Sequence, residues 1–174
     1  NTGRIRDQWH TMTRSGLSPR LSYYLAEPFC EIHPVDAAAC GIGEATLVRL
    51  ESASGFVIVR ALLTERQQKS SLFVPMHWTG IQASAARVDA LVAANVDPIS
   101  GQPASKNSAV SLKPFDAVWH GFAVTGKRPV SLDTGYWAMA KTNGGWRVEL
   151  AGTEALNHSE AYARTLFGIT QDAP

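Results

Sequence analysis

The stretch TLVRLESASGFVIVRALL, residues 46–63, decides the fold class of this chain. Its two apolar runs, residues 46–51 and 56–63, have the length of strands and are rich in leucine, valine and isoleucine. The residues between them, Ser52-Ala53-Ser54-Gly55, have the small and polar composition of a turn. The stretch therefore predicts a β-hairpin with two apolar strands.

Shorter elements flank this hairpin on both sides. Residues 29–33 alternate like a strand, and Pro34 opens a short helix that ends at Gly41. Residues 72–76 form a further apolar strand, and residues 109–112 have the pattern of a last strand that closes a barrel. We expect residues 15–28 to be irregular and residues 83–94 to be partly helical.

The C-terminal part predicts one more strand, a hairpin and a helix. Residues 118–124 form the strand, and residues 136–140 and 146–150 flank an Asn143-Gly144 turn. Asn157-His158-Ser159-Glu160 has the pattern of a capping box, and the helix after it ends near Phe167-Gly168.

Composition excludes several classes of protein. The chain has 174 residues, of which 45% are apolar and 18% charged, and its net charge of +1 creates no overall field for nucleic acid or a membrane. No apolar run approaches the roughly 20 residues of a membrane helix, and no signal peptide is visible. Cys30 and Cys40 are too few for a metal centre, and a disulfide between them is the alternative to the free, buried thiols that we expect. Because the chain starts at Asn1, directly at its richest motif, we expect a fragment of a longer polypeptide.

The candidate binding residues are concentrated in residues 2–14, TGRIRDQWHTMTR. Gly3 lets the backbone approach a ligand, Arg4, Arg6 and Arg14 suit phosphate oxygens, and hydroxyl, amide and imidazole groups lie between them. No strand or helix periodicity explains the run, which predicts a loop for an anionic, aromatic ligand such as a nucleotide. A solvated basic loop at a frayed terminus is the competing interpretation.

The order of these residues resembles the TGR-x-x-x-x-WHTMTR segment of molybdenum-dependent assimilatory nitrate reductases, in the molybdopterin oxidoreductase family. Residues 97–106 resemble a second element of that family, DPxSxxP followed by lysine. One departure is visible: Ala45-Thr46 stand where the family has Gly-Asp before the second strand. Since alanine resists positive φ, we expect Gly41 and Gly43 to shift that turn.

The resemblance implies a mainly β fold, a double-psi β-barrel of the aspartate-decarboxylase-like type with short helices and a C-terminal hairpin plus helix. It implies a molybdopterin dinucleotide-binding barrel over residues 1–113. Residues 114–174 would be a C-terminal extension packed on that barrel in the same structural unit.

The resemblance also implies a cofactor, Mo-bis-MGD, in which two molybdopterin guanine dinucleotides hold one molybdenum. The residues implied to bind it are Thr2, Gly3, Arg4, Gln8, Trp9, His10, Thr11, Asp89 and Lys106. Relatives have asparagine where Asp89 stands, and an ionised carboxylate cannot reproduce both amide roles. The resemblance places Lys106 and the first loop, roughly a hundred residues apart, on one cofactor at one rim of the barrel.

By the same resemblance, the complete enzyme reduces nitrate to nitrite in the cytoplasm. The implied partners are upstream domains of the same polypeptide and an electron donor protein, with no nucleic acid and no membrane. The iron–sulfur cluster and the molybdenum ligand are expected upstream, so the chain itself carries no catalytic or metal-binding residue and is inactive alone.

Two other classes remain open. One is the same domain of a formate dehydrogenase-like molybdoenzyme, and the other is a double-psi barrel that serves only in protein recognition. His33, His120 and His158 have no partner at a functional spacing and are interpreted as structural. His77 and Trp78 follow a barrel strand, where a place along a substrate channel is the alternative to a structural role.

Overall fold

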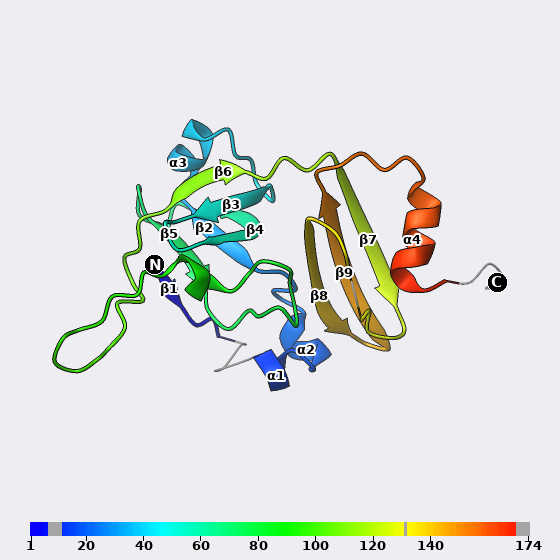
Figure 1. Ribbon diagram of the computed structural model, residues 1–174, viewed down its shortest axis with the longest axis horizontal. Coiled ribbons are helices and arrows are strands. Elements are labelled where there is room, and N and C mark those ends of the chain that lie inside the picture. Colours follow the sequence, from blue (N-terminus) through cyan, green and yellow to red (C-terminus); the bar gives the residue numbers. More distant parts are fainter. Residues whose placement is uncertain (7–11, 131, 170–174) are drawn as a thin grey trace.

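The computed structural model describes residues 1–6, 12–130 and 132–169. Over these residues the chain is mainly β, with two sheets that lie side by side and short helices around them (Figure 1). The prediction of a mainly β fold is therefore confirmed.

The first sheet has six strands in the order β1-β5-β2-β4-β3-β6. Their bounds are β1 Thr2–Gly3, β2 Phe29–Ile32, β3 Leu47–Glu51, β4 Phe56–Leu63, β5 Leu72–Pro75 and β6 Ser111–Pro114. The β1–β5 and β2–β4 pairs are parallel, whereas β2–β5, β3–β4 and β3–β6 are antiparallel. Strands β2 to β5 agree with the sequence prediction, and β6 begins two residues later than expected, whereas β1 lies where a loop was predicted. Closure of this sheet into a double-psi barrel stays a prediction, because β1 and β6 form its two ends.

The predicted hairpin of β3 and β4 is confirmed and lies at the centre of the molecule. Val48 pairs with Val59, and the Ser52 amide donates to the Gly55 carbonyl at 2.9 Å to close the turn. Both faces of the hairpin are buried. Side chains on one face enter the core of the first sheet, and Leu47 and Ile58 on the other face meet the second sheet. This double burial explains why the two strands are continuous apolar runs rather than alternating ones.

The parallel pairing of β2 with β4 depends on a helix between β2 and β3. Helix α3, Pro34–Ala39, begins with proline as predicted, and the His33 Nδ1 accepts from the Val35 amide at 3.1 Å. This bond caps the helix and confirms the structural interpretation of His33. After the helix, Gly41 takes a φ of +67°.

Ala45 corrects the expectation of a shifted turn. It keeps the left-handed conformation itself, with φ of +59°, and its carbonyl accepts from the Arg60 Nη1 at 3.1 Å. A left-handed alanine brings its Cβ close to the following carbonyl and costs about 1–2 kcal/mol. The turn geometry is therefore retained without the family glycine, at the expense of backbone strain.

The second sheet has the order β7-β9-β8. Its strands are β7 Trp119–Thr125, β8 Tyr136–Thr142 and β9 Gly145–Gly152. The β8–β9 hairpin turns at Asn143-Gly144, as predicted, and Tyr136 and Ala138 on one face pack against Leu47 and Ile58.

Helix α4, Ser159–Phe167, covers the opposite face of the second sheet. It ends at Gly168, as predicted, with φ of +63°. The predicted capping box is wrong: the N-cap is His158, and its side chain makes no capping hydrogen bond.

Residues 83–94 are partly helical, as expected, through the 3-10 helix η1 (Val88–Leu91). Two further expectations about local structure are corrected. Residues 15–28, expected to be irregular, contain a short helix, α2 (Pro19–Ser22). Trp78 is buried in the core between the two sheets, which contradicts a place for its ring along a channel. The division between residues 1–113 and 114–174 stays a prediction.

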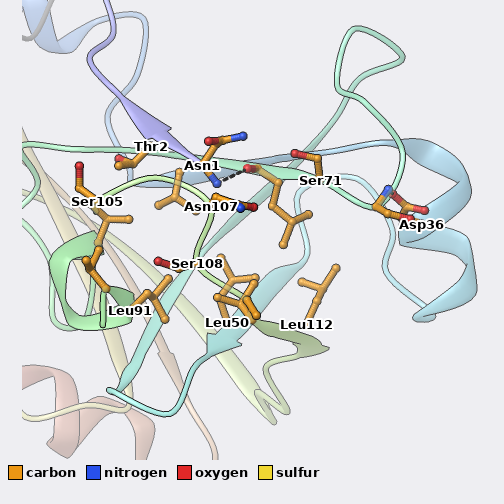
Figure 2. Close-up of a pocket in the computed structure, with 17 residues that line it drawn as sticks. Asn1, Thr2, Asp36, Leu50, Ser71, Leu91, Ser105, Asn107, Ser108 and Leu112 are labelled. Carbon is orange, nitrogen blue, oxygen red and sulfur yellow. Dashed lines mark hydrogen bonds between the residues drawn. The ribbon is translucent and has the colours of Figure 1, made fainter. Parts of the chain in front are cut away.

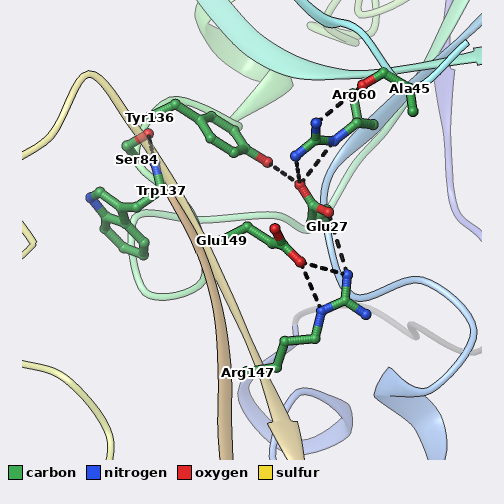
Figure 3. Close-up of polar contacts among 8 residues, drawn as sticks. All are labelled: Glu27, Ala45, Arg60, Ser84, Tyr136, Trp137, Arg147 and Glu149. Carbon is green, nitrogen blue, oxygen red and sulfur yellow. Dashed lines mark hydrogen bonds and ion pairs between the residues drawn. The ribbon is translucent and has the colours of Figure 1, made fainter. Parts of the chain in front are cut away.

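A cluster of charged side chains joins the two sheets (Figure 3). The Glu27 Oε2 accepts from the Arg60 Nη2 at 2.6 Å and from the Tyr136 hydroxyl at 2.8 Å, and the Glu27 Oε1 lies 3.5 Å from the Arg147 Nη2. The Arg147 Nη2 also lies 2.9 Å from the Glu149 carboxylate. Burial and then Glu27 raise the pKa of Tyr136 well above its usual range, and burial and then Glu27 also raise the pKa of Glu149. Glu27 thus connects β4 with β8 and β9.

The first prediction concerns this connection. Glu27→Gln should lower the free energy of unfolding by about 3 kcal/mol, because two partly buried guanidinium groups lose their shared charge. Urea denaturation measures the change. Glu51→Gln is the control, since Glu51 pairs with Arg49 and Lys113 on the surface and its loss should change the free energy of unfolding far less. Equal effects of the two substitutions would contradict the connecting role of Glu27.

The second prediction concerns Ala45. Ala45→Gly should raise the free energy of unfolding by about 0.5–1 kcal/mol, because the relief of left-handed strain exceeds the extra chain entropy of glycine. Ala38→Gly, in the exposed part of α3, should lower it by about 1 kcal/mol. A loss of stability at both positions would show that Ala45 carries no strain.

The third prediction concerns the cysteines. Cys30 is a buried free thiol, as expected, but Cys40 is exposed, because it caps the C-terminus of α3 at the surface. Burial raises the pKa of Cys30 to about 12. A maleimide at neutral pH should therefore label one thiol in the folded chain and two in urea, as counted by mass spectrometry, and Cys40→Ser should abolish the folded-state label.

The raised pKa of Cys30 also predicts that the free energy of unfolding falls as the pH rises from about 9 toward 12, because only the unfolded state loses the Cys30 proton there.

Candidate functional site

The first two residues of the motif run form an edge strand rather than a loop. In β1, Thr2 pairs with Val74 and Gly3 with Pro75 of β5. The Met76 amide donates to the Gly3 carbonyl at 2.9 Å, and the Asn1 nitrogen donates to the Leu72 carbonyl at 2.9 Å (Figure 2). No periodic pattern predicts this strand, because two residues are too few to show alternation. The run also contains a one-turn helix, α1 (Met12–Ser15), which corrects the expectation of an irregular loop there.

Lys106 lies against this strand, as the resemblance implied. Its ammonium donates a hydrogen bond to the Thr2 carbonyl across 104 residues of sequence. A Cβ built on Gly3 would lie 4.0 Å from the Lys106 Nζ and 3.2 Å from the Phe73 ring. A larger residue at position 3 would therefore have to displace the Phe73 ring, and glycine lets β1 pack closely against β5 beside the ammonium group.

Thr2 carries a buried polar atom without a partner among the described residues. The residue is 5% exposed, and its Oγ1 makes no hydrogen bond with any part of the chain that the structure describes. Buried hydroxyls are normally satisfied, so an unsatisfied one beside a cavity indicates a contact that a ligand completes.

That cavity has a volume of about 430 Å³ and opens between β1 and the segment around Lys106. Its floor is aliphatic and its rim is polar (Figure 2). The floor includes Leu50, Val88, Leu91 and Leu112, and the rim includes Thr2, Ser105, Asn107 and Ser108. Two charged groups belong to residues that line the cavity: the Asp36 carboxylate, which accepts from the Ser70 amide at 2.6 Å, and the terminal ammonium of Asn1. In the 105–107 segment, the uncharged Ser105 and Asn107 line the cavity, whereas the Lys106 ammonium contacts β1.

The DPISGQP segment, residues 97–103, forms a turn ahead of Lys106. The Asp97 Oδ1 accepts from the Ser100 amide at 2.7 Å, from the Ser100 hydroxyl at 2.9 Å and from the Ile99 amide at 3.1 Å. The hydrogen bonds from Ser100 and then Ile99 lower the pKa of Asp97. Gly101 follows with φ of +68°. In this motif the aspartate and the serine thus hold the turn together through their hydrogen bonds, and the glycine takes its left-handed position ahead of Lys106.

Asp89 lies apart from these groups. It is on η1, where the neighbouring Val88 and Leu91 are buried and line the cavity while Asp89 itself is exposed. Its place as a cofactor contact stays a prediction. Arg4 is exposed one residue after β1, and Gln8, Trp9, His10 and Thr11 lie outside the described residues.

Sequence reasoning missed Ser105 and Asn107 at the rim. They are the direct neighbours of Lys106, but Asn107 takes a left-handed φ of +63°, so strand alternation could not have pointed to them. Within the residues that the structure describes, no group of three or more His, Cys, Asp and Glu side chains could hold a metal ion, and no helix is long and apolar enough to cross a membrane.

Comparison with known proteins gives the family to which this chain belongs. Residues 1–109 match the family described as "Molydopterin dinucleotide binding domain", and the chain belongs to that family. The family bears out the prediction of a molybdopterin guanine dinucleotide cofactor.

The chain is 41% identical over 153 residues to a nitrate reductase of Klebsiella oxytoca, a match that spans 87% of this chain and 18% of that protein. It is 36% identical over 114 residues to the assimilatory nitrate reductase catalytic subunit of Bacillus subtilis, over 66% of this chain and 16% of that protein. An F420-dependent formate dehydrogenase subunit of Methanococcus maripaludis is 34% identical over 83 residues, or 48% of this chain and 12% of that protein. The chain thus spans less than a fifth of the length of the relatives that it matches.

Among solved structures, acetylene hydratase from Pelobacter acetylenicus superimposes with a TM-score of 0.54 over 64% of this chain and 17% of that protein. The sequence identity is 15%, so this likeness concerns the fold alone.

Proposed function

We propose that this chain is the part of a molybdenum nitrate reductase that holds Mo-bis-MGD while nitrate is reduced to nitrite. The observation that carries the proposal is the meeting of Lys106 with β1, because it brings the two family motifs together on one edge of the sheet. The similarity to nitrate reductases over 87% of the chain supports nitrate as the substrate. A formate dehydrogenase-like enzyme is the weaker alternative, because that similarity covers 48% of the chain.

The residues of β1 and the Lys106 segment fit such a cofactor. Lys106 would place a positive charge beside a phosphate oxygen, and Gly3 would let the cofactor approach the backbone. The Thr2 hydroxyl would find its missing partner in a cofactor heteroatom, and Arg4 would add a second cationic group at the exposed end of β1. When bound, the cofactor supplies a redox-active molybdenum, and this chain binds and orients it.

The remaining predicted contacts belong to the same proposal. Gln8, Trp9, His10 and Thr11 would continue along the pterin and phosphate portion from the end of β1, and Asp89 would accept from a ring NH. The working enzyme would be cytoplasmic and would receive its electrons from a donor protein. Its upstream domains would contribute the iron–sulfur cluster and the molybdenum ligand.

The fourth prediction tests this function through Lys106. In the full-length enzyme, Lys106→Ala should reduce cofactor affinity tenfold or more, because a charge-assisted hydrogen bond of about 1.5–3 kcal/mol is lost. Molybdenum content and nitrate reduction should fall together, while the melting temperature stays nearly unchanged. Lys106→Arg should restore part of the loss, because the planar guanidinium fills the space differently.

Lys113→Ala is the matched control. Lys113 lies on β6 with its side chain mostly exposed and pairs with Glu51 at 3.7 Å, away from β1. This variant should retain its molybdenum. Full molybdenum content and full activity in Lys106→Ala would refute the assignment of Lys106.

A further inference from the structure

Residues 17–24 present an unusual concentration of large apolar side chains to solvent. Leu17 is 62% exposed, Leu21 37%, Tyr23 81% and Tyr24 68%. The two tyrosine rings pack edge to face with centroids 5.6 Å apart, so they form one aromatic surface. Exposed apolar side chains concentrated in one short segment of a folded protein indicate a place of contact with another protein. We call these four side chains the Leu17–Tyr24 face.

The surroundings of this face are positively charged. A depression of about 600 Å³ lies beside the tyrosines, and its lining includes Arg20, Lys141 and Arg147 but no aspartate or glutamate. The nearest carboxylates of the connecting cluster, Glu27 and Glu149, are already engaged with Arg147. A complementary surface would therefore be apolar at its centre with carboxylates at its edge.

The position of the face relates it to the cofactor motifs. It follows directly on α1, whose Met12 is buried in the core between the two sheets, and α2 packs against β8. Figure 1 shows α1 and α2 together at the lower edge of the molecule, between β1 and β8. The Arg6 guanidinium lies 5.3 Å from the centre of the Tyr24 ring, so the motif run and the face are in direct contact. A protein that covers the face would thus also reach the cofactor loop.

We propose that the Leu17–Tyr24 face is the docking surface for the larger remainder of the molybdoenzyme, through an apolar patch edged by carboxylates. This inference rests on the proposed function, in which another part of the enzyme forms the opposite wall of the cofactor site. The matched nitrate reductase of Klebsiella oxytoca is more than five times as long as the matched region, which supplies a partner of sufficient size. The basic lining of the depression selects an acidic edge on that partner.

Hydroxyl-radical footprinting of the purified full-length enzyme tests the surface directly. The rates of modification of Tyr23 and Tyr24 are measured in the native enzyme and in the same enzyme unfolded in urea. Docking should slow both rates at least tenfold in the native enzyme. If Tyr23 and Tyr24 were as exposed in the enzyme as they are in this chain, their native and unfolded modification rates would agree within about a factor of two. That result would overturn the proposal.

A pair of charge variants tests the chemistry of the partner. The double variant Arg20→Glu with Tyr24→Asp in the full-length enzyme should make residues 17–24 at least tenfold more susceptible to limited proteolysis, because like charges would then face each other. Val130→Asp is the control, since Val130 is fully exposed on the loop after β7 and should leave proteolysis unchanged. Equal proteolysis of the double variant and the wild-type enzyme would contradict an acidic partner.

The cofactor content of the wild-type enzyme separates this inference from the proposed function. Protected tyrosines in an enzyme without molybdenum would leave the docking surface standing and refute the cofactor role. Exposed tyrosines in an enzyme with stoichiometric molybdenum would refute the docking surface alone.

Discussion

The double burial of the β3–β4 hairpin is the constraint on which the rest of the structure depends. One face of the hairpin closes the core of the first sheet, and the other face receives Tyr136 and Ala138 of the second sheet. Because β4 also pairs in parallel with β2, the chain must pass through α3 and the strained turn at Ala45 before it can form the hairpin. The parallel edge that carries β1 is then fixed through β2 and β5. The candidate site is therefore positioned by strands that contribute few residues to it.

Sequence patterns over a few neighbouring residues predicted the elements that are formed by those residues themselves. The β3–β4 hairpin, the Asn143-Gly144 turn and the proline-started helix α3 follow from residue types and spacing, and all three are present. The β1 strand could not be predicted in this way, because two residues become a strand only through Val74 and Pro75, which lie more than seventy positions later. The exposed Cys40 and the left-handed Ala45 also escaped prediction, since both follow from the path of the chain around α3 rather than from residue preference.

The candidate site shows a similar division. The resemblance of the two motifs to one family was enough to predict that Lys106 and the first motif lie together, and the contact of Lys106 with Thr2 agrees with it. The neutral rim of Ser105 and Asn107 and the unpartnered Thr2 hydroxyl become visible only in the folded chain, because ordinary serines, asparagines and threonines have no distinctive spacing. The fold is also less specific than the motifs: a 15% identical acetylene hydratase shares it, whereas the nitrate reductases share the sequence as well.

The dependence of β1 on later strands has a consequence for how the protein is made. The first motif leaves the ribosome well before β5 and Lys106, so for that time no sheet edge exists to which Thr2 and Gly3 can pair. Contacts between residues this far apart in sequence form late, because the intervening chain must be ordered first. Under the proposed function, cofactor loading through these groups would follow folding of the first sheet. A delay in β5 would then leave a nascent chain that has its first motif but no sheet edge for it.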